Sequence, residues 1–189
     1  CNAPSTMASY RASGLKYFRK QQIDLLRREL RHFVDTYHAD SIYFWAETFL
    51  LWNPQEFDAF CEMYEEFKLP FWIQTRTETV TRDRFKKLKR LGCIRIGFGV
   101  EHGNEQFRAT MLRRSVKNAL IVERLNIIAD VGIPVSVNNM IGFPTETREL
   151  AFDTVELNRR FRSDGINAYT FVPFAGTPLP ELKGVVSWK

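Results

Sequence analysis

Acidic, amide and guanidinium side chains recur wherever an apolar run of this sequence ends. They are Glu47 with Thr48, Gln74 with Arg76, Glu101, Asn138 with Asn139, and the stretch 174–177. If the runs are parallel strands, their carboxyl ends meet on one rim, where ligands bind in α/β folds. Carboxylates suit an ammonium group and hydroxyls, and an arginine suits a carboxylate. The set therefore predicts a site for a zwitterion that carries a sugar.

Each of these residues also has a purely structural explanation when it is taken alone. A single strand-end glutamate such as Glu47 or Glu101 is explained equally well as a helix cap or a salt-bridge partner. The GFPTE stretch at 142–146 resembles the start of a helix whose amides face a ligand, but its spacing favours a glycine-proline turn with Thr145 as the cap. Recurrence at four successive strand ends is what favours a shared site.

The stretch 93–114 is central to this prediction. Ile94, Ile96 and Phe98 alternate with Arg95 and a glycine, which predicts a buried strand. The strand would carry Glu101 at its carboxyl end, and Gly103 would then break the chain. A helical pattern follows and ends in Arg113 and Arg114. An acid and a guanidinium are therefore expected at the mouth of one strand–loop–helix unit.

Other familiar kinds of site are absent from the sequence. Neither GxxxxGK[ST] nor GxGxxG occurs, and His32 and His38 fall on or near the first predicted helix, so no zinc set emerges. Cys1, Cys61 and Cys93 are odd in number and far apart, which argues against a disulfide framework. We expect Cys61 and Cys93 to be buried as apolar residues.

The composition is that of one soluble globular domain covering residues 1–189. Of its residues 44% are hydrophobic and 26% charged, and no run approaches the roughly 20 apolar residues of a membrane helix. No secretory signal opens the chain, so a cytoplasmic location is expected. The net charge of +5 is scattered along predicted helices, which favours solvated helix faces over a nucleic-acid surface. The missing initiator methionine suggests a segment of a longer protein.

The predicted elements alternate strand and helix. Residues 1–19 are turn-rich and predicted as a loop. Helices are expected over 20–36, 53–67, 81–91, 115–130 and 145–161, and strands over 41–46, 70–75, 94–99, 133–141 and 168–172. This order predicts an α/β fold with a parallel sheet covered by helices. Five strands are too few for a closed eight-stranded barrel, which leaves a curved partial barrel or an open doubly wound sheet.

Several stretches in order resemble the radical S-adenosylmethionine (radical SAM) enzymes, and most closely the branch that often carries a cobalamin-binding domain. They are WAETF at 45–49, IGFGVEHGNE at 96–105, LRRSV at 112–116, GIPVSVNNMIGFPTET at 132–147 and FVPFAGTPL at 171–179, all after Cys1. The resemblance implies a partial (β/α)6 TIM-like barrel, here lacking its first strand. It also implies a 4Fe–4S cluster on a CxxxCxxC motif. Cys1 matches the third cysteine; the other two are not in this sequence, so either the segment was cut inside the motif or the protein lacks a cluster.

The resemblance also implies roles for the strand-end residues. Glu47 and Thr48 match the motif that binds the methionine ammonium, although its usual glycines are missing. Arg114 matches the arginine that pairs with the methionine carboxylate, with Arg113 as a rival. Glu101 matches a polar residue near the ribose.

The remaining implied roles concern the second half of the chain and one earlier arginine. Asn138 matches a ribose contact, and the run Gly142, Phe143 and Pro144 passes beside the adenine. Arg76 is expected to reach either the cofactor or the substrate. The implied metal ligand is Cys1.

The implied activity is reductive cleavage of S-adenosylmethionine to a 5′-deoxyadenosyl radical, with cobalamin-assisted methyl transfer or rearrangement as the leading subclass. The expected partners are a small-molecule, peptide or RNA substrate and an electron donor such as ferredoxin or flavodoxin, with no membrane. A tRNA methylthiotransferase is the rival within the family. A non-catalytic barrel scaffold without a cluster, or an α/β barrel that binds an unrelated metabolite, are the rivals outside it.

Overall fold

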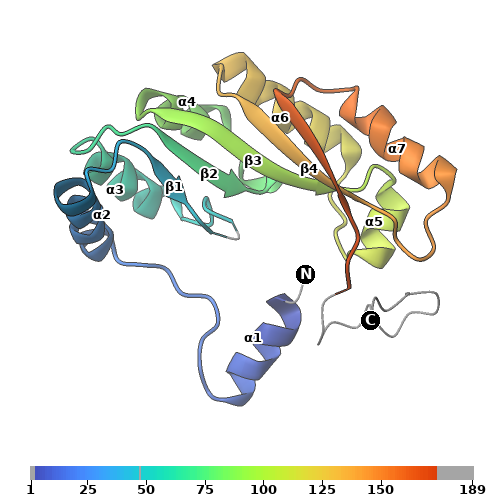
Figure 1. Cartoon of the computed structure of the whole chain (residues 1–189), viewed down its shortest axis with the longest axis horizontal. Helices are drawn as coiled ribbons and strands as arrows, with labels where there is room; N and C mark the ends of the chain where they lie inside the picture. The colour runs from blue at the N-terminus through green and yellow to red at the C-terminus, as the bar shows by residue number, and fades with distance from the viewer. Residues whose placement is uncertain (1–2, 47, 174–189) are drawn as a thin grey trace.

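A computed structural model describes residues 3–46 and 48–173, and there five strands form one parallel sheet (Figure 1). The strands are β1 (Ile42–Phe44), β2 (Phe71–Thr75), β3 (Cys93–Glu101), β4 (Val135–Ile141) and β5 (Gly165–Thr170). They lie side by side in chain order, β1-β2-β3-β4-β5, and every pair is parallel. The predicted α/β class and parallel sheet are confirmed.

The helices lie mainly over the convex side of an arched sheet (Figure 1). They are α1 (Ala3–Ala12), α2 (Ile23–Tyr37), α3 (Pro54–Tyr64), α4 (Arg82–Arg90), α5 (Glu105–Met111), α6 (Asn118–Val131) and α7 (Arg148–Asn158), with a 3-10 turn η1 (Thr77–Thr79). A doubly wound sheet reverses its strand order and carries helices on both faces. The uninterrupted order and the single helical layer therefore exclude that alternative and give the curved partial barrel.

Alternating side chains divide the sheet into a packed face and an open face. Phe71, Ile73 and Phe98 are fully buried toward the helices, whose apolar faces complete a single core cluster. The intervening residues face the concave side, where Gln74 lies in register with Gly97 and Gly97 with Ser136. The packed face stabilises the fold, and the concave face is left for polar and small residues.

Most helix ends follow the chemistry that the sequence predicts. Asn53 caps α3 in a reciprocal capping box with Glu56, each donor–acceptor distance being 2.8 Å, and Pro54 is the first helical residue. Thr81 caps α4, and Gly132 ends α6 in the left-handed conformation. These caps fix where each helix meets its strand.

The prediction of a loop over residues 1–19 is wrong, because Ala3–Ala12 forms α1. None of the residues in α1 is buried, so the helix has no apolar stripe from which it could be recognised. Its small residues and a proline in the first turn are compatible with a helix without requiring one.

Several predicted boundaries also differ from the structure. Thr147 caps α7 instead of Thr145, and α7 begins at Arg148. The last strand is Gly165–Thr170 instead of 168–172, and α6 begins at Asn118 instead of residue 115. The helix after Gly103 ends at Met111, before the two arginines.

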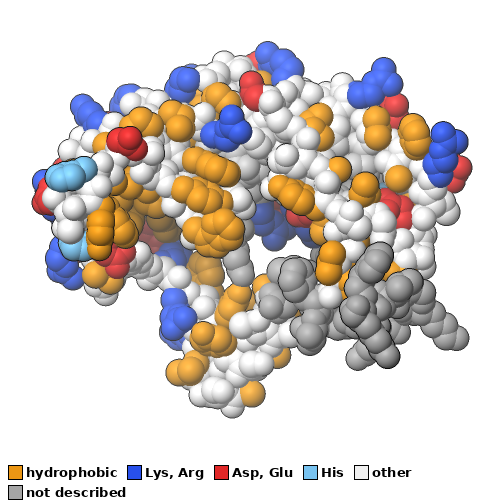
Figure 2. All heavy atoms as spheres, in the orientation of Figure 1, with side chains coloured by type: hydrophobic (Ala, Val, Ile, Leu, Met, Phe, Trp, Pro, Cys, Tyr) orange, Lys and Arg blue, Asp and Glu red, His pale blue; other side chains and the backbone are white. Residues whose placement is uncertain are grey.

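The basic residues of α2 and α4 lie on solvated helix surfaces, as predicted, and several pair with acids on or after a neighbouring helix. Arg27 and Arg31 of α2 both contact Glu66 after α3, and Lys87 of α4 contacts Asp58 of α3. On the face drawn in Figure 2 the blue side chains are scattered and do not form one patch. None of the described helices is long and apolar enough to cross a membrane.

Candidate functional site

Glu101 ends β3 in a left-handed backbone conformation, with φ of 71°. The register between β3 and β4 shifts between Gly99 and Glu101, as at a β-bulge. The Glu101 side chain folds back over Gly99, where a Cβ would lie 2.1 Å from the Glu101 Oε1 atom. Glycine at position 99 is therefore what allows the carboxylate to lie on the concave face.

Arg114 reaches the same point from the far side of α5. Arg113 has a φ of 53° and is exposed, so the chain turns there and directs the next side chain back to the sheet. Arg114 Nη1 donates to the Gly99 carbonyl at 2.8 Å and to Glu101 Oε1 at 3.2 Å. The structure thus brings Arg114, and not Arg113, to Glu101.

Burial governs the charge of this pair. It raises the pKa of Glu101 above its ordinary value, an effect that Arg114 opposes, and it lowers the pKa of Arg114, an effect that Glu101 opposes. The Nε atom of Arg114 is buried and has no partner among the described residues. A half-buried acid and a guanidinium with an unused donor form a site that suits a ligand with both an anionic and a hydroxyl group.

Amide side chains continue the site onto β4 and β5. Asn138 is in register with Gly99 on one side and with Asn167 on the other, and Asn167 Nδ2 donates to Asn138 Oδ1 at 3.0 Å. Asn139 points to the opposite face, where it is buried and exchanges hydrogen bonds with Asn158 of α7. Only Asn138 of the predicted pair therefore faces the concave side.

The other predicted residues lie around this centre. Arg76 is exposed just after β2 and pairs with Glu78 at 2.5 Å, and Gln74 Nε2 donates to the Tyr43 hydroxyl at 2.6 Å. Thr48 lines a cavity of about 490 Å³ between the segment 17–21 and the loop after β1. Cys1, Glu47 and the stretch 174–177 lie outside the described residues.

The turn at 142–144 is held from within its own loop. The carboxylate of Glu146 accepts from the amides of Gly142 and of Phe143, the latter at 3.1 Å. The Phe143 ring is buried and stacks on Phe171 with centroids 4.7 Å apart. The prediction of a glycine-proline turn is confirmed, while its amides are engaged by Glu146 and its helix cap is Thr147.

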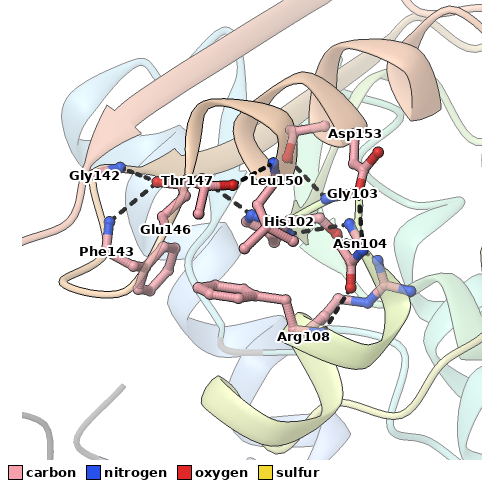
Figure 3. Close-up of polar contacts among 12 residues, drawn as sticks. His102, Gly103, Asn104, Arg108, Gly142, Phe143, Glu146, Thr147, Leu150 and Asp153 are labelled. Atoms are coloured by element: carbon pink, nitrogen blue, oxygen red, sulfur yellow. Dashed lines mark hydrogen bonds and ion pairs between the residues drawn. The ribbon is translucent and has the colours of Figure 1, made fainter.

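His102 connects this turn to β3, and no pattern in the sequence had singled it out. It is fully buried, and its Nδ1 accepts from the Asn104 amide at 3.0 Å, so the proton lies on Nε2. Nε2 donates to Glu146 Oε1 at 3.0 Å (Figure 3). Burial lowers the pKa of His102, an effect that Glu146 opposes. The imidazole is therefore neutral with one defined tautomer.

A buried arginine fixes the connection from β3 through α5 to α6. Arg108 has no exposed surface; it donates from Nη1 to the His102 carbonyl and from Nη2 to the Val116 carbonyl at 2.5 Å. Its Nη2 also donates to Asn118 Oδ1 at 2.8 Å. Because these bonds satisfy loop carbonyls, Arg108 sets the path of the segment that ends in Arg114.

Gly103 lets this loop approach α7 closely. Its amide donates to Thr154 Oγ1 at 2.8 Å, and a Cβ at position 103 would lie 2.1 Å from the Asp153 carbonyl oxygen. Asn104 caps α5 and also donates to Asp153 Oδ2 at 2.8 Å. The β3–α5 loop and α7 are thereby packed backbone to backbone.

The concave face also carries an aromatic cluster, formed by Tyr43, Trp45 and Trp72. The Tyr43 and Trp72 rings stack with centroids 4.1 Å apart, and Trp45 meets Tyr43 edge to face at 5.4 Å. Trp45 is 83% exposed. Figure 2 shows hydrophobic side chains gathered over β1 and β2. This end of the concave face is apolar, while the end at Glu101 is charged.

The described cysteines do not suit a metal centre. Cys61 and Cys93 are buried in the core as predicted, and burial raises their thiol pKa to about 11 and about 12. A metal centre requires thiolates, which such pKa values disfavour. Across 3–46 and 48–173, no three His, Cys, Asp or Glu residues are placed to hold a metal ion.

Comparison with known proteins gives one family match and a set of similar folds. Residues 1–157 match the family model described as the radical SAM superfamily. No curated protein matches this sequence.

Three solved structures illustrate the likeness in fold. Coproporphyrinogen III oxidase (HemN) from Escherichia coli, a radical SAM enzyme, matches with a TM-score of 0.68 and 17% identity, over 83% of this chain and 39% of that one. The cobalamin-dependent S-adenosylmethionine radical enzyme OxsB matches with a TM-score of 0.65 and 17% identity, over 76% of this chain and 23% of that one. The radical S-adenosylmethionine methyltransferase TsrM from Kitasatospora setae matches with a TM-score of 0.66 and 12% identity, over 80% of this chain and 31% of that one. At these identities the likeness concerns the fold, and the chain spans less than half the length of each.

Proposed function

The chain belongs to the radical S-adenosylmethionine superfamily, and from this premise we propose that the full-length protein cleaves S-adenosylmethionine reductively to a 5′-deoxyadenosyl radical. The observation that carries the proposal is the Glu101–Arg114 pair on the concave face, next to Asn138. A bound, reduced 4Fe–4S cluster supplies the electron that breaks the sulfonium carbon–sulfur bond. The work of the described residues is to bind and orient the cofactor.

In this proposal each polar group at the site has a matching group on the cofactor. Arg114 pairs with the methionine carboxylate, because its Nε is buried without a partner and its Nη1 is already fixed by the Gly99 carbonyl. Glu101 and Asn138 accept from the ribose hydroxyls. Gly142, Phe143 and Pro144 lie beside the adenine, where the buried Phe143 ring offers an apolar contact.

The proposal assigns the remaining contacts to residues at the mouth of β1 and β2. Glu47 and Thr48 bind the methionine ammonium, and Arg76 contacts the cofactor or the substrate. The cluster is assigned to Cys1 together with two cysteines that this sequence does not contain. Cys61 and Cys93 are unsuitable because both are buried in the core with raised pKa values.

Within the superfamily we propose cobalamin-assisted methyl transfer or rearrangement as the reaction class. Support comes from the fold, which resembles both the cobalamin-dependent enzyme OxsB and the methyltransferase TsrM, structures with bound cobalamin. The resemblance to HemN, whose description names no cobalamin, means that the fold alone does not single out this class. The proposed setting is the cytoplasm, with ferredoxin or flavodoxin as the electron donor and a small molecule, peptide or RNA as the substrate.

The test uses the full-length protein purified without oxygen. We expect about four irons per chain, as in a 4Fe–4S centre, and formation of 5′-deoxyadenosine after dithionite and S-adenosylmethionine are added. Arg114→Gln should abolish most of this product, while Arg113→Gln, a change to the neighbouring exposed arginine, should leave it unchanged. A wild-type protein that holds no iron and forms no 5′-deoxyadenosine would favour a non-catalytic scaffold. Hydroxocobalamin added during reconstitution tests the subclass, because a bound corrin is visible in the absorption spectrum.

A further inference from the structure

We propose that His102 is a positioning residue for the turn formed by Gly142, Phe143 and Pro144, which it controls through Glu146. The inference deepens the proposed function and rests on it, because that turn is the one assigned to the adenine. His102 is far from the turn in sequence, and the two are joined by hydrogen bonds through the Glu146 carboxylate, which lies between them (Figure 3).

The hydrogen bonds form a continuous chain from the β3–α5 loop to the turn, and the Glu146 carboxylate accepts from both sides. The Asn104 amide donates to His102 Nδ1, and His102 Nε2 donates to Glu146 Oε1. The other carboxylate oxygen, Oε2, accepts from the amides of Gly142 and Phe143. One carboxylate thus joins the imidazole to two successive backbone donors, and its orientation fixes both.

The surroundings of His102 hold the imidazole itself in place. Its ring stacks on Phe107 with centroids 4.3 Å apart and meets Phe143 edge to face at 6.1 Å. Arg108 donates to the carbonyl of His102, so the backbone of this residue is also held. The ring is fully buried and both of its nitrogens are hydrogen-bonded, with Nε2–H directed at Glu146.

The anchor matters because the turn includes a glycine in a conformation that the free chain seldom holds. Gly142 has a φ of 81°, in the region that glycine populates freely and other residues avoid. Glycine also leaves the unanchored chain many alternative conformations, and proline at 144 has no amide to donate. The bonds to Glu146 select one of these conformations, and His102 keeps Glu146 from turning toward solvent.

The test compares two substitutions at position 102. His102→Leu removes both hydrogen bonds, whereas His102→Gln retains an amide donor and an acceptor and should rescue the effect. His32→Leu is the matched control, because His32 is an exposed histidine of α2 that contacts Thr36 of the same helix. Each full-length variant is examined by hydrogen–deuterium exchange over peptides covering residues 142–146, and by S-adenosylmethionine binding.

We expect His102→Leu to speed exchange at 142–146 about tenfold and to weaken S-adenosylmethionine binding by about tenfold, the effect of losing one hydrogen bond to a charged group. Exchange at the β2 and β3 core should be unchanged, and both effects should be largely reversed in His102→Gln. Unchanged exchange in the turn would overturn the inference. So would a uniform rise over the whole sheet, because that is the mark of a purely structural role.

Binding separates this inference from the proposed function. If His102→Leu loosens the turn but leaves S-adenosylmethionine affinity at the wild-type value, the positioning role is refuted while the proposed function stands. If the wild-type protein itself does not bind S-adenosylmethionine, the proposed function fails, and with it the part of the inference that concerns the cofactor. The exchange data then still decide whether His102 fixes the turn.

Discussion

Glu101 is placed for binding at some cost to the stability of the fold. Its backbone is left-handed, its carboxylate is mostly removed from water, and burial raises its pKa despite the Arg114 guanidinium 3.2 Å away. A side chain serving only stability would not be expected to combine a strained backbone with a desolvated charge. The residue is therefore better explained by a ligand than by the fold.

Replacing Glu101 with glutamine should separate these two effects. Because the pKa of Glu101 in the folded protein is above the ordinary value of 4.5, the folded protein keeps the carboxyl proton at pH values where the unfolded chain has lost it. The free energy of unfolding therefore decreases as the pH rises from 4.5 through the pKa of the folded protein. Glu101→Gln should remove this loss, so the variant should be at least as stable as wild type at pH 7 by urea unfolding. Its affinity for S-adenosylmethionine should fall about tenfold or more. A variant that unfolds more easily and binds normally would contradict this account.

His102 should give the opposite pH dependence. Burial lowers its pKa from the ordinary 6.5, so below that pH the unfolded chain binds a proton that the folded protein does not. Stability should therefore fall as the pH drops below 6.5, by at most about 1.4 kcal/mol per pH unit. Unfolding measured between pH 5 and 7 should show a smaller slope in His102→Gln than in wild type. Equal slopes would show that the histidine does not titrate in this way.

Among the elements, the β3–α5 loop and the middle of α7 form the unit on which the site depends. Gly103 lies against the backbone of Asp153 and Thr154, and its own amide is bound by the Thr154 hydroxyl. The three atoms nearest to a Cβ at position 103 would all be backbone atoms of Asp153 and Thr154, which cannot move aside as a flexible side chain could. The spacing between β3 and α7 is therefore set by the absence of a side chain at position 103.

A methyl group at that position should separate the two elements. We expect Gly103→Ala to lower the free energy of unfolding by about 3 kcal/mol, because the new Cβ would lie 2.1 Å from a backbone oxygen. Gly165→Ala is the control, since a Cβ there would meet only the Ser136 hydroxyl at 3.5 Å, an ordinary contact. Urea denaturation of both variants gives the comparison. Equal losses would mean that close packing at Gly103 does not matter.

The sequence predicted the elements whose residues show a periodic pattern, and it failed where the pattern is missing. Strands β2 and β4 alternate buried and half-buried residues, and the start of α3 is marked in the sequence by the capping residues Asn53, Pro54 and Glu56. The helix α1 buries nothing, so its residues resemble a loop. Periodicity arises from packing against a core, and an element without such packing leaves no trace of it.

The candidate site was predictable in part for the same reason. Glu101 and Asn138 could be found because each belongs to a recognisable strand, and Arg114 because it follows a helical pattern. His102 and Arg108 were missed because they are polar residues buried in a loop and a short helix. Their partners are backbone groups of nearby loops and, for His102, the carboxylate of Glu146, 44 residues along the chain. Only the folded path of the chain brings such partners together.

At the scale of the whole molecule, the described residues share one hydrophobic core. The buried cluster runs from Leu30 of α2 to Phe161 after α7, and its densest part is aromatic, with Phe60 of α3 in contact with Phe44, Phe49 and Trp52. A contiguous core of this kind favours a single cooperative unfolding transition. Damage at one end should then lower the stability of the whole sheet.

Truncation at Phe60 tests this expectation. Phe60→Ala should cost about 3–5 kcal/mol, a large share of the roughly 5–15 kcal/mol available to a domain of this kind. Exchange in α7, at the opposite end of the sheet, should accelerate in parallel. Phe152→Ala provides the control, because Phe152 is 51% exposed on α7 and its loss should change stability by less than about 0.5 kcal/mol. Acceleration confined to α3 would show that the two ends unfold independently.

The order β1-β2-β3-β4-β5 also has a consequence for folding during synthesis on the ribosome. Among the described residues, each strand pairs only with the strands immediately before and after it along the chain, so none of these strands has to wait for a partner made much later. As each strand–helix unit emerges, the edge that receives it is already exposed and its own helix can cover it. Such a sheet can grow in the direction of translation, and the search for long-range pairings that slows many parallel sheets is reduced to a series of short closures. The turn anchored by Glu146 is completed only after β4 has docked, so the part of the site that we propose for the adenine forms later than the part at Glu101.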